Sequence, residues 1–225
     1  MSFKSISQKV VGSVVLAGTM FMAAYAQPKF IELSEPAQLV KTSNPAQVEV
    51  VEVFSYTCGH CYQLEAPVAN WLKSKPADVN FVRIQMPGEG VWESLARTYF
   101  TLEAMDKVEE GHPVMYKATM VDRLRAFDKD AIAAYLAKNA GINAEEFAKL
   151  WNSFPVTSSY NRALDLVQNQ YKVDYTPVFI IDGKYLVNGE TSRATSYAEI
   201  VEAVDEVSKE LLAKKQAEAV PAQAE

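Results

Sequence analysis

Cys58 and Cys61 are the only two cysteines in the 225-residue chain. Gly59 and His60, one of two histidines, separate them. Thiol–disulfide exchange requires one accessible thiolate that attacks and a second thiol close enough to resolve the mixed disulfide. In a strand-to-helix turn, the first position points outward and the position three residues later packs toward the core. The spacing therefore predicts a redox pair in which Cys58 attacks and Cys61 resolves.

The predicted position of Cys58 at the start of a helix favours its thiolate. Unpaired backbone N–H groups and the positive end of the helix dipole lie at that point and would lower the pKa of the thiol. His60 would add an N–H donor, and a positive charge when it is protonated. A stabilised thiolate favours the reduced pair, so these features predict an oxidant of other thiols.

Other uses of the pair stay open. A disulfide across a two-residue loop closes almost no chain and stabilises little, which disfavours a purely structural bridge. A four-ligand zinc or copper site is disfavoured because His60 lies inside the loop and His112 lies in a remote helical stretch. We expect no metal and no cofactor. A chaperone or peptide-binding protein with incidental thiols is the non-enzymatic alternative, and replacing both cysteines by serine would spare its binding.

The first 26 residues read as a secretory signal peptide. Lys4 and Lys9 precede a mostly apolar run, and Ala24-Tyr25-Ala26 has the small-x-small pattern of a cleavage site, so we expect cleavage after Ala26. The apolar run is too short and too interrupted for a membrane span of about 20 residues. Export matters because an oxidising compartment allows the two thiols to carry a disulfide.

Composition limits the class of protein. With 49% hydrophobic residues, the chain has enough apolar material for one sizeable core, or for a core with an inserted subdomain. Two cysteines are too few for a disulfide-stapled scaffold. Without residues 1–26 the net charge is −8, since two lysines and no acids are removed. Such an acidic surface disfavours nucleic acid and anionic membranes as partners.

Two strands and a long helical stretch surround the pair. The valine-rich residues 47–55 predict a buried strand that ends just before Cys58, and residues 79–86 predict a second strand. Between them, a helix is expected to present one apolar face, with Pro67 kinking it or weakening its hydrogen bonds. Helical patterns dominate residues 92–171. The predicted apolar face of the first helix consists of Tyr62, Ala66, Ala69 and Leu72.

Helix-breaking and helix-capping residues divide the predicted helical stretch. Gly111, Gly141 and Pro155 are expected to stop or start helices, and Asn143 with Glu146 resembles a capping box. After it, two strands flank Gly183 as a hairpin, and residues 196–213 repeat apolar residues at helical spacing. We expect residues 214–225 to form a disordered tail.

This order of elements resembles a thioredoxin-like domain with a helical insertion, and in particular the DsbA family. The resemblance is carried by residues 52–65, 151–154 and 175–188. It implies an α/β fold in which residues 27–88 and 172–213 form a thioredoxin-like domain around a central mixed sheet. Residues 89–171 would then form an inserted all-helical subdomain.

The resemblance also implies a function. DsbA proteins are periplasmic thiol:disulfide oxidoreductases that donate a disulfide to reduced, unfolded exported proteins, and a membrane quinone reductase of the DsbB type reoxidises them. We expect a monomer, because residues 27–46 leave no room for the dimerisation domain of DsbC-like proteins. Two residues depart from better-known members: Gly59 replaces proline, and Thr176 occurs as in the isomerase DsbC. A periplasmic disulfide isomerase or reductase therefore remains an alternative.

Two further site residues follow from general chemistry and the resemblance together. A cis bond between Thr176 and Pro177 would turn backbone groups toward the cysteines. Glu52 lies in an otherwise apolar strand, so either that strand face is exposed or the acid is buried beneath the cysteines and exchanges protons with Cys61. The resemblance aligns Glu52 with the buried acid of DsbA. Burial would raise the pKa of Glu52 and Arg83 on the next strand would lower it, so the sequence alone does not determine the direction of the pKa shift.

Overall fold

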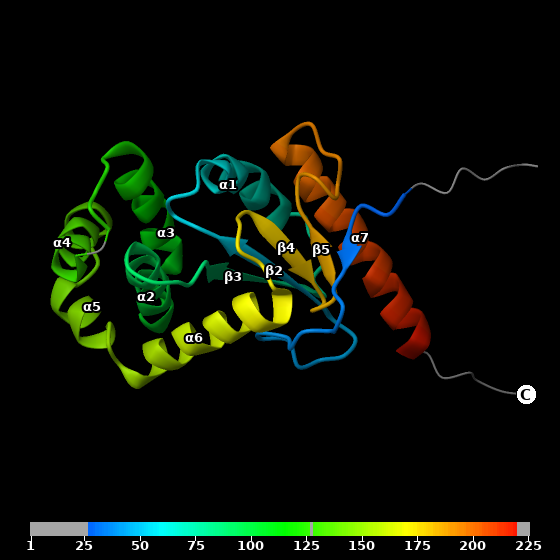
Figure 1. Ribbon diagram of the computed structural model, residues 1–225, viewed down its shortest axis with the longest axis horizontal. Helices are drawn as coiled ribbons and strands as arrows, with labels where there is room; N and C mark the ends of the chain where they lie inside the picture. Colours follow the sequence, from blue (N-terminus) through cyan, green and yellow to red (C-terminus); the bar gives the residue numbers. More distant parts are fainter. Residues whose placement is uncertain (1–26, 127, 220–225) are drawn as a thin grey trace, which may run out of the picture.

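A five-stranded mixed sheet lies at the centre of this computed structural model, which describes residues 27–126 and 128–219 (Figure 1). The strand order is β1-β5-β4-β2-β3, with β2 and β3 parallel and the other neighbours antiparallel, as the predicted mixed sheet requires. The predicted signal peptide, residues 1–26, lies outside the described residues. The strands are β1 (Ile31–Glu32), β2 (Val48–Phe54), β3 (Val79–Gln85), β4 (Val178–Ile181) and β5 (Tyr185–Val187).

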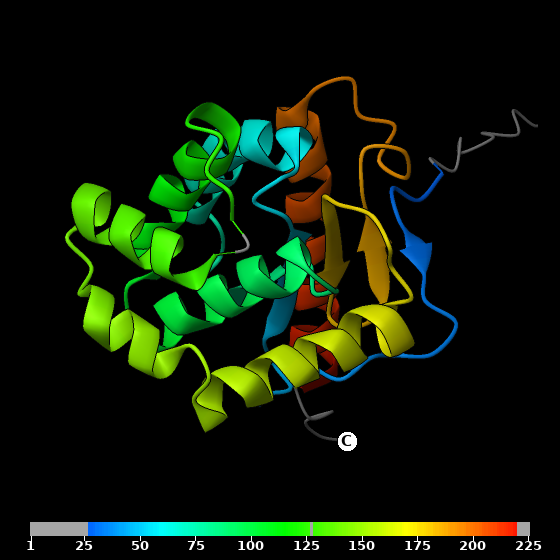
Figure 2. The ribbon, with the colours of Figure 1, turned by 60° about the vertical axis from the view of Figure 1, so that its left-hand side comes forward.

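Helices fill the connection between β3 and β4, as predicted, and gather beside the sheet (Figures 1 and 2). Two π-helical turns, η1 (Lys117–Val121) and η2 (Asp165–Tyr171), continue α3 and α6. Among the described residues, no helix is both long enough and apolar enough to span a bilayer. The α-helices are α1 (Gly59–Leu72), α2 (Val91–Ala104), α3 (Val108–Tyr116), α4 (Lys129–Ala140), α5 (Ala144–Leu150), α6 (Phe154–Leu164) and α7 (Tyr197–Ala219).

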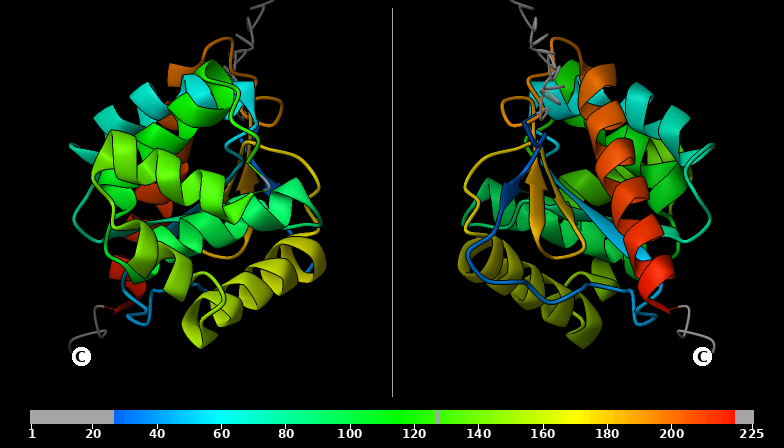
Figure 3. Two further views of the ribbon diagram at one scale, coloured as in Figure 1. Left: turned by 90° about the vertical axis from the view of Figure 1, so that its left-hand side faces the viewer. Right: turned by 90° about the vertical axis from the view of Figure 1, so that its right-hand side faces the viewer.

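The two faces of the sheet carry separate hydrophobic clusters. On one face Val48 and Val50 pack with residues of α1 and α7, and Figure 3 shows α7 running along the sheet. On the other face Val51 and Val53 pack with α2, α6 and η2. Every residue of β2 is buried, because this central strand is covered on both sides. Since β2 ends four residues before Cys58, a fully buried strand inside the sheet positions the cysteine pair.

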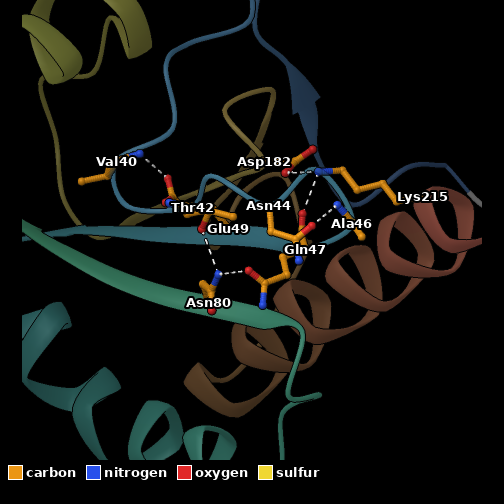
Figure 4. Close-up of polar contacts among 9 residues, drawn as sticks. All are labelled: Val40, Thr42, Asn44, Ala46, Gln47, Glu49, Asn80, Asp182 and Lys215. Atoms are coloured by element: carbon orange, nitrogen blue, oxygen red, sulfur yellow. Dashed lines mark hydrogen bonds and ion pairs between the residues drawn. The ribbon is translucent and has the colours of Figure 1, made fainter. Parts of the chain in front are cut away.

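The N-terminal segment is tied to β2 by a buried carboxylate. Glu49 accepts backbone N–H bonds from Val40 and Thr42 at 2.6 and 2.8 Å (Figure 4). It accepts a third, from Lys41 N, at 2.7 Å. The side-chain amide of Asn80 on β3 donates to Thr42 Oγ1 at 3.0 Å. Three N–H donors replace the water that an ionised carboxylate loses on burial, so the acid is tolerated in the core.

The predicted disordered tail is wrong over residues 214–219, because α7 continues to Ala219. Residues 220–225 lie outside the described residues. Lys215 explains the extension: its Nζ donates to Gln47 O at 2.8 Å and to Asp182 Oδ1 at 2.7 Å (Figure 4). These contacts fasten the end of α7 to the start of β2 and to the β4–β5 turn. Alanine-rich sequence without glycine or proline lets the helix reach them.

The predicted apolar face of α1 is also wrong. Tyr62 is 40% exposed, whereas the buried residues are Cys61, Leu64, Val68 and Trp71. Cys61 packs into the core, and the residues at its i+3, i+7 and i+10 positions lie on the same face of the helix and are buried with it. The helix runs through Pro67 without ending.

Gly111 lies inside α3 and does not end a helix, contrary to the prediction. A Cβ atom there would lie 2.6 Å from Leu102 Cδ2, so the glycine allows α3 to approach α2 closely. The other predicted boundaries are confirmed: Gly141 ends α4 with a left-handed φ of 68°, Asn143 caps α5 through Glu146 N at 2.9 Å, and Pro155 lies in the first turn of α6.

Candidate active site

Cys58 is the N-cap residue of α1, as the sequence predicts. Its extended backbone (φ −95°, ψ 113°) is held by a bond from Cys58 N to Ser55 O at 2.9 Å. Its Sγ accepts the N–H of Cys61 at 3.1 Å, so the sulfur replaces the oxygen of an ordinary helix cap. Both cysteines are free thiols, with Cys58 partly exposed and Cys61 buried. The exposed and shielded positions are those predicted.

The two thiols have opposite pKa shifts. Hydrogen bonds from the Cys61 thiol, from Thr176 and from the backbone N–H groups of Cys61 and His60 lower the pKa of Cys58 to about 5, against the opposing effect of burial. Burial, together with the hydrogen bond to Cys58, raises the pKa of Cys61 far above its ordinary value. At neutral pH, Cys58 is therefore a thiolate and Cys61 a thiol.

The Thr176–Pro177 peptide bond is cis, as predicted, and places the carbonyl of Thr176 beside the pair. Cys58 Sγ lies 3.6 Å from Thr176 O. A pocket of about 200 Å³ opens next to Cys58, and Trp92 and Tyr175 in its wall are 39% and 45% exposed. The remaining lining residues are Ser55, Thr57, Met86 and Thr176.

His60 acts on Cys58 through its backbone N–H, while its ring turns to another partner. The ring Nδ1 lies 2.8 Å from the hydroxyl of Tyr197, the first residue of α7. Tyr197 was not predicted, because nothing local in the sequence links it to a histidine 137 positions away.

Gly59 is not required by sterics. A Cβ atom at this position would meet nothing within 4 Å. The residue between the cysteines therefore faces solvent and leaves room for a side chain.

Glu52 is buried, with a side-chain exposure of 0%, so the alternative of an exposed strand face is excluded. Arg83 Nε lies 2.9 Å from its Oε2, and Oε1 has no hydrogen-bond partner among the described residues. Burial outweighs the Arg83 charge and raises the pKa of Glu52 to about 7. The negative charges of Glu65 and Cys58 add to this increase, so the protonation of Glu52 responds to the charge on Cys58.

Three residues missed at the sequence level extend this buried polar group. Glu65 Oε2 lies 3.4 Å from an Arg83 terminal nitrogen and 3.2 Å from His112 Nε2. His112 Nδ1 lies 2.9 Å from the hydroxyl of Tyr56. Glu65 could have been suspected from its position one helical turn after Cys61, whereas His112 was considered only as a metal ligand. Among the described residues no group of three or more potential metal ligands occurs.

Two thiols with opposed pKa values, held at a helix start and facing a cis-proline loop, define a thiol–disulfide oxidoreductase with a thioredoxin-like fold. The family model described as DSBA-like thioredoxin domain matches residues 49–201, and the chain belongs to this family. The resemblance seen in the sequence is therefore confirmed, as are the fold class and the enzyme class.

Curated relatives agree. The chain is 32% identical over 177 residues to the thiol:disulfide interchange protein DsbA of Pseudomonas aeruginosa, covering 76% of this chain and 82% of that protein. It is 28% identical to the protein of the same name from Bordetella parapertussis, covering 88% of this chain and 94% of that protein.

Solved structures are similar as well. The crystal structure of Pseudomonas aeruginosa DsbA superposes with a TM-score of 0.73 at 29% identity, covering 85% of this chain and 94% of that one. A Proteus mirabilis DsbA solved with a non-covalently bound peptide has a TM-score of 0.67 at 25% identity, covering 83% of this chain and 96% of that one.

Proposed function

We propose that this protein donates disulfides to reduced, unfolded exported proteins in the periplasm through Cys58 and Cys61. The observation that carries the proposal is the low pKa of the accessible Cys58 thiol beside the high pKa of the buried Cys61 thiol. A stabilised thiolate in the reduced pair makes the disulfide form an oxidant. The effect is at most about 60 mV for two electrons, and less after solvent screening, because Cys58 is partly exposed.

The oxidised pair reacts in two exchange steps. A client thiolate attacks Cys58 Sγ, the Cys58–Cys61 bond breaks, and Cys61 leaves as a thiolate that takes up a proton. A second client thiolate then attacks the client sulfur of the mixed disulfide, and Cys58 leaves as a thiolate. The client loses two electrons and gains a disulfide. Because a thiol of low pKa leaves faster, the environment of Cys58 favours the second step.

Glu52 is proposed to exchange the proton of Cys61. With a pKa of about 7 it can supply a proton to the departing Cys61 thiolate and can accept one when Cys61 must attack. Reoxidation requires the second role, because Cys61 must then resolve a mixed disulfide between Cys58 and the oxidant. We propose a membrane quinone reductase of the DsbB type as that oxidant.

The pocket beside Cys58 is proposed to receive a client side chain next to the reacting cysteine. Its exposed aromatic walls favour apolar residues, which unfolded clients expose. Thr176, ahead of β4, could pair with an extended client segment. The peptide bound to the Proteus relative supports this kind of ligand.

We also propose a localisation, a domain organisation and an oligomeric state. The signal-like residues 1–26, with cleavage after Ala26, support export to the periplasm. We propose that residues 89–171 form an inserted helical subdomain and that the protein acts as a monomer.

A reduction potential measured against glutathione tests the proposal. We expect a potential well above that of thioredoxin, about −270 mV, and rapid oxidation of a reduced, unfolded client. A value near that of thioredoxin would contradict the oxidase function and favour a reductase. Thr176 and Gly59 keep an isomerase as the second candidate, and preferential reshuffling of a scrambled client over oxidation of a reduced one would support it.

A further inference from the structure

We propose that His112 is a positioning residue of the disulfide reaction: by holding Glu65, it keeps Arg83 on Glu52, the acid that exchanges the Cys61 proton. This inference depends on the proposed role of Glu52. His112 comes from α3, in the helical segment between β3 and β4. Its ring therefore joins that segment to the site.

The His112 ring is fixed in place by its neighbours. The residue is 4% exposed and its ring packs edge-on against Phe54 and Tyr116 at centroid distances of 5.0 Å. Tyr99 covers a further edge at 6.2 Å. Because the ring has no room to turn, each nitrogen has one assigned partner: Nδ1 the Tyr56 hydroxyl at 2.9 Å, and Nε2 the Glu65 carboxylate at 3.2 Å.

These partners select one protonation state of His112. Although burial opposes it, the His112 donor and the Arg83 charge hold the pKa of Glu65 below its usual range, so Glu65 is ionised and only accepts. Nε2 must then carry the ring proton. Burial raises the pKa of Tyr56 well above its usual range, so its hydroxyl keeps its proton and donates to Nδ1. The neutral Nε2–H form accepts the Tyr56 hydrogen bond and points its N–H dipole toward Glu65, at 3.2 Å but outside hydrogen-bond geometry.

Burial and Arg83 also oppose a charged ring, against the opposite effect of Glu65, and the pKa of His112 is lowered overall. The titratable groups facing it from the surrounding elements are Tyr56 before α1, Glu65 on α1, Arg83 on β3, Tyr99 on α2, and Glu109 and Tyr116 on α3.

The Nε2–H donor decides how Arg83 is shared. Arg83 contacts Glu52 at 2.9 Å through Nε and Glu65 at the longer distance of 3.4 Å through a terminal nitrogen. The Nε2–H dipole of His112 lies 3.2 Å from the same Glu65 oxygen and stabilises its negative charge. Without it, the ionised Glu65 would draw Arg83 away from Glu52. Glu52 would then lose the charge that opposes its burial, and less of it would be ionised at neutral pH to accept the Cys61 proton.

The test compares His112→Phe with His112→Gln. Phenylalanine keeps the ring packing and removes both polar contacts, whereas glutamine can accept from Tyr56 and donate to Glu65. In each variant, a mixed disulfide is formed at Cys58 and its resolution by Cys61 is followed by stopped flow between pH 5 and 9. We expect the acid limb of the pH–rate profile to move up by half a unit or more in His112→Phe, which slows the reaction about threefold at pH 6. His112→Gln should restore the profile.

An unchanged profile in His112→Phe would overturn the inference, provided that Glu52→Gln removes the acid limb. If Glu52→Gln also leaves the profile unchanged, the proposed role of Glu52 has failed and the inference falls with it. Should His112→Phe fail to fold, nitrogen NMR of the wild-type ring still decides. We expect the neutral His112 ring to carry its proton on Nε2; the Nδ1–H form would overturn the inference.

Discussion

Two buried glutamates on β2, three residues apart, meet opposite environments. Glu49 receives three backbone N–H bonds, whereas Glu52 shares one guanidinium with Glu65 and keeps one oxygen without a partner among the described residues. Hydrogen bonds to an ionised carboxylate offset the free energy of its desolvation, and their absence leaves that cost in place. We therefore expect Glu49 to stabilise the fold and Glu52, when ionised, to destabilise it.

Glu52→Gln should stabilise the reduced protein in a pH-dependent way. The folded pKa of Glu52, about 7, lies above its ordinary value of 4.5, so the folded state resists ionisation. The resulting destabilisation is absent below about pH 4.5, grows between pH 4.5 and 7, and is complete above pH 7, where it reaches about 3 kcal/mol. Urea unfolding at pH 5 and pH 8 measures it; an equal gain at both pH values would contradict the raised pKa.

Glu49→Gln should lower the stability of the fold, whereas Glu52→Gln should raise it. The amide cannot accept all three N–H bonds, and its own NH₂ group would face donors, so we expect a loss of about 2–3 kcal/mol. Hydrogen exchange at the amides of Val40, Lys41 and Thr42 should accelerate before the rest of the protein unfolds. Glu52→Gln is the matched control on the same strand, and stabilisation by both substitutions would refute this account of Glu49.

The cysteine pair gives a trapping prediction. Because the Cys58 thiolate is accessible and the Cys61 thiol is buried, Cys61→Ser should accumulate mixed disulfides with reduced clients on non-reducing gels, while Cys58→Ser should accumulate none. In Cys61→Ala the Cys58 thiolate loses its Cys61 side-chain donor, so its ultraviolet absorbance should titrate above pH 5. Trapping by Cys58→Ser alone would reverse the two roles.

At the scale of elements, glycine acts differently in two helices. Gly111 sits where α3 crosses α2, and Ala there would bring a Cβ to 2.6 Å from the buried Leu102. Overpacking of about 1–3 kcal/mol should exceed the helix-propensity gain of about 1 kcal/mol, so Gly111→Ala should destabilise the fold.

Gly59→Ala is the control for this substitution. Its Cβ meets nothing within 4 Å, so it should stabilise α1 by up to about 1 kcal/mol. Thermal unfolding of the two variants should give shifts of opposite sign; shifts of the same sign would mean that Leu102 yields at little cost.

Elements marked by local chemistry could be predicted from the sequence. The valine run before Cys58, the hairpin around Gly183 and the cap at Asn143 are each specified within about ten residues. The Thr176–Pro177 geometry and the burial of Glu52 needed the family resemblance as well.

Contacts between distant segments could not be predicted. His112 and Tyr56 are 56 positions apart, and Lys215 and Gln47 are 168 apart, so no local pattern joins them. The predicted apolar face of α1 was wrong for a related reason. Several faces of that helix carry apolar residues, and only the packing of Cys61 into the core determines which one is buried.

For the whole molecule, the redox state of two sulfurs should be visible in the stability of the fold. The folded pKa of Cys58, about 5, lies below its ordinary value of 9.0. This shift stabilises the reduced fold fully above pH 9, progressively less as the pH falls, and not at all below pH 5. The disulfide form has no thiol to ionise.

The melting temperature of the reduced form minus that of the oxidised form should therefore grow from pH 5 to pH 8. Calorimetry of both forms across this range measures the difference. A difference that does not change with pH would show that the Cys58 thiolate contributes nothing to the oxidising power.

At Gly59 the side chain is free to vary, although the geometry of the two neighbouring sulfurs is fixed. Its side-chain position is open to solvent on a backbone that any residue can adopt, while the sulfurs on either side of it are fixed by β2, α1 and Thr176. A change at this one position can alter the field at Cys58 without moving a packed atom. Mutation and selection can therefore adjust the reduction potential of the cysteine pair in small, reversible steps, with the rest of the protein inherited unchanged.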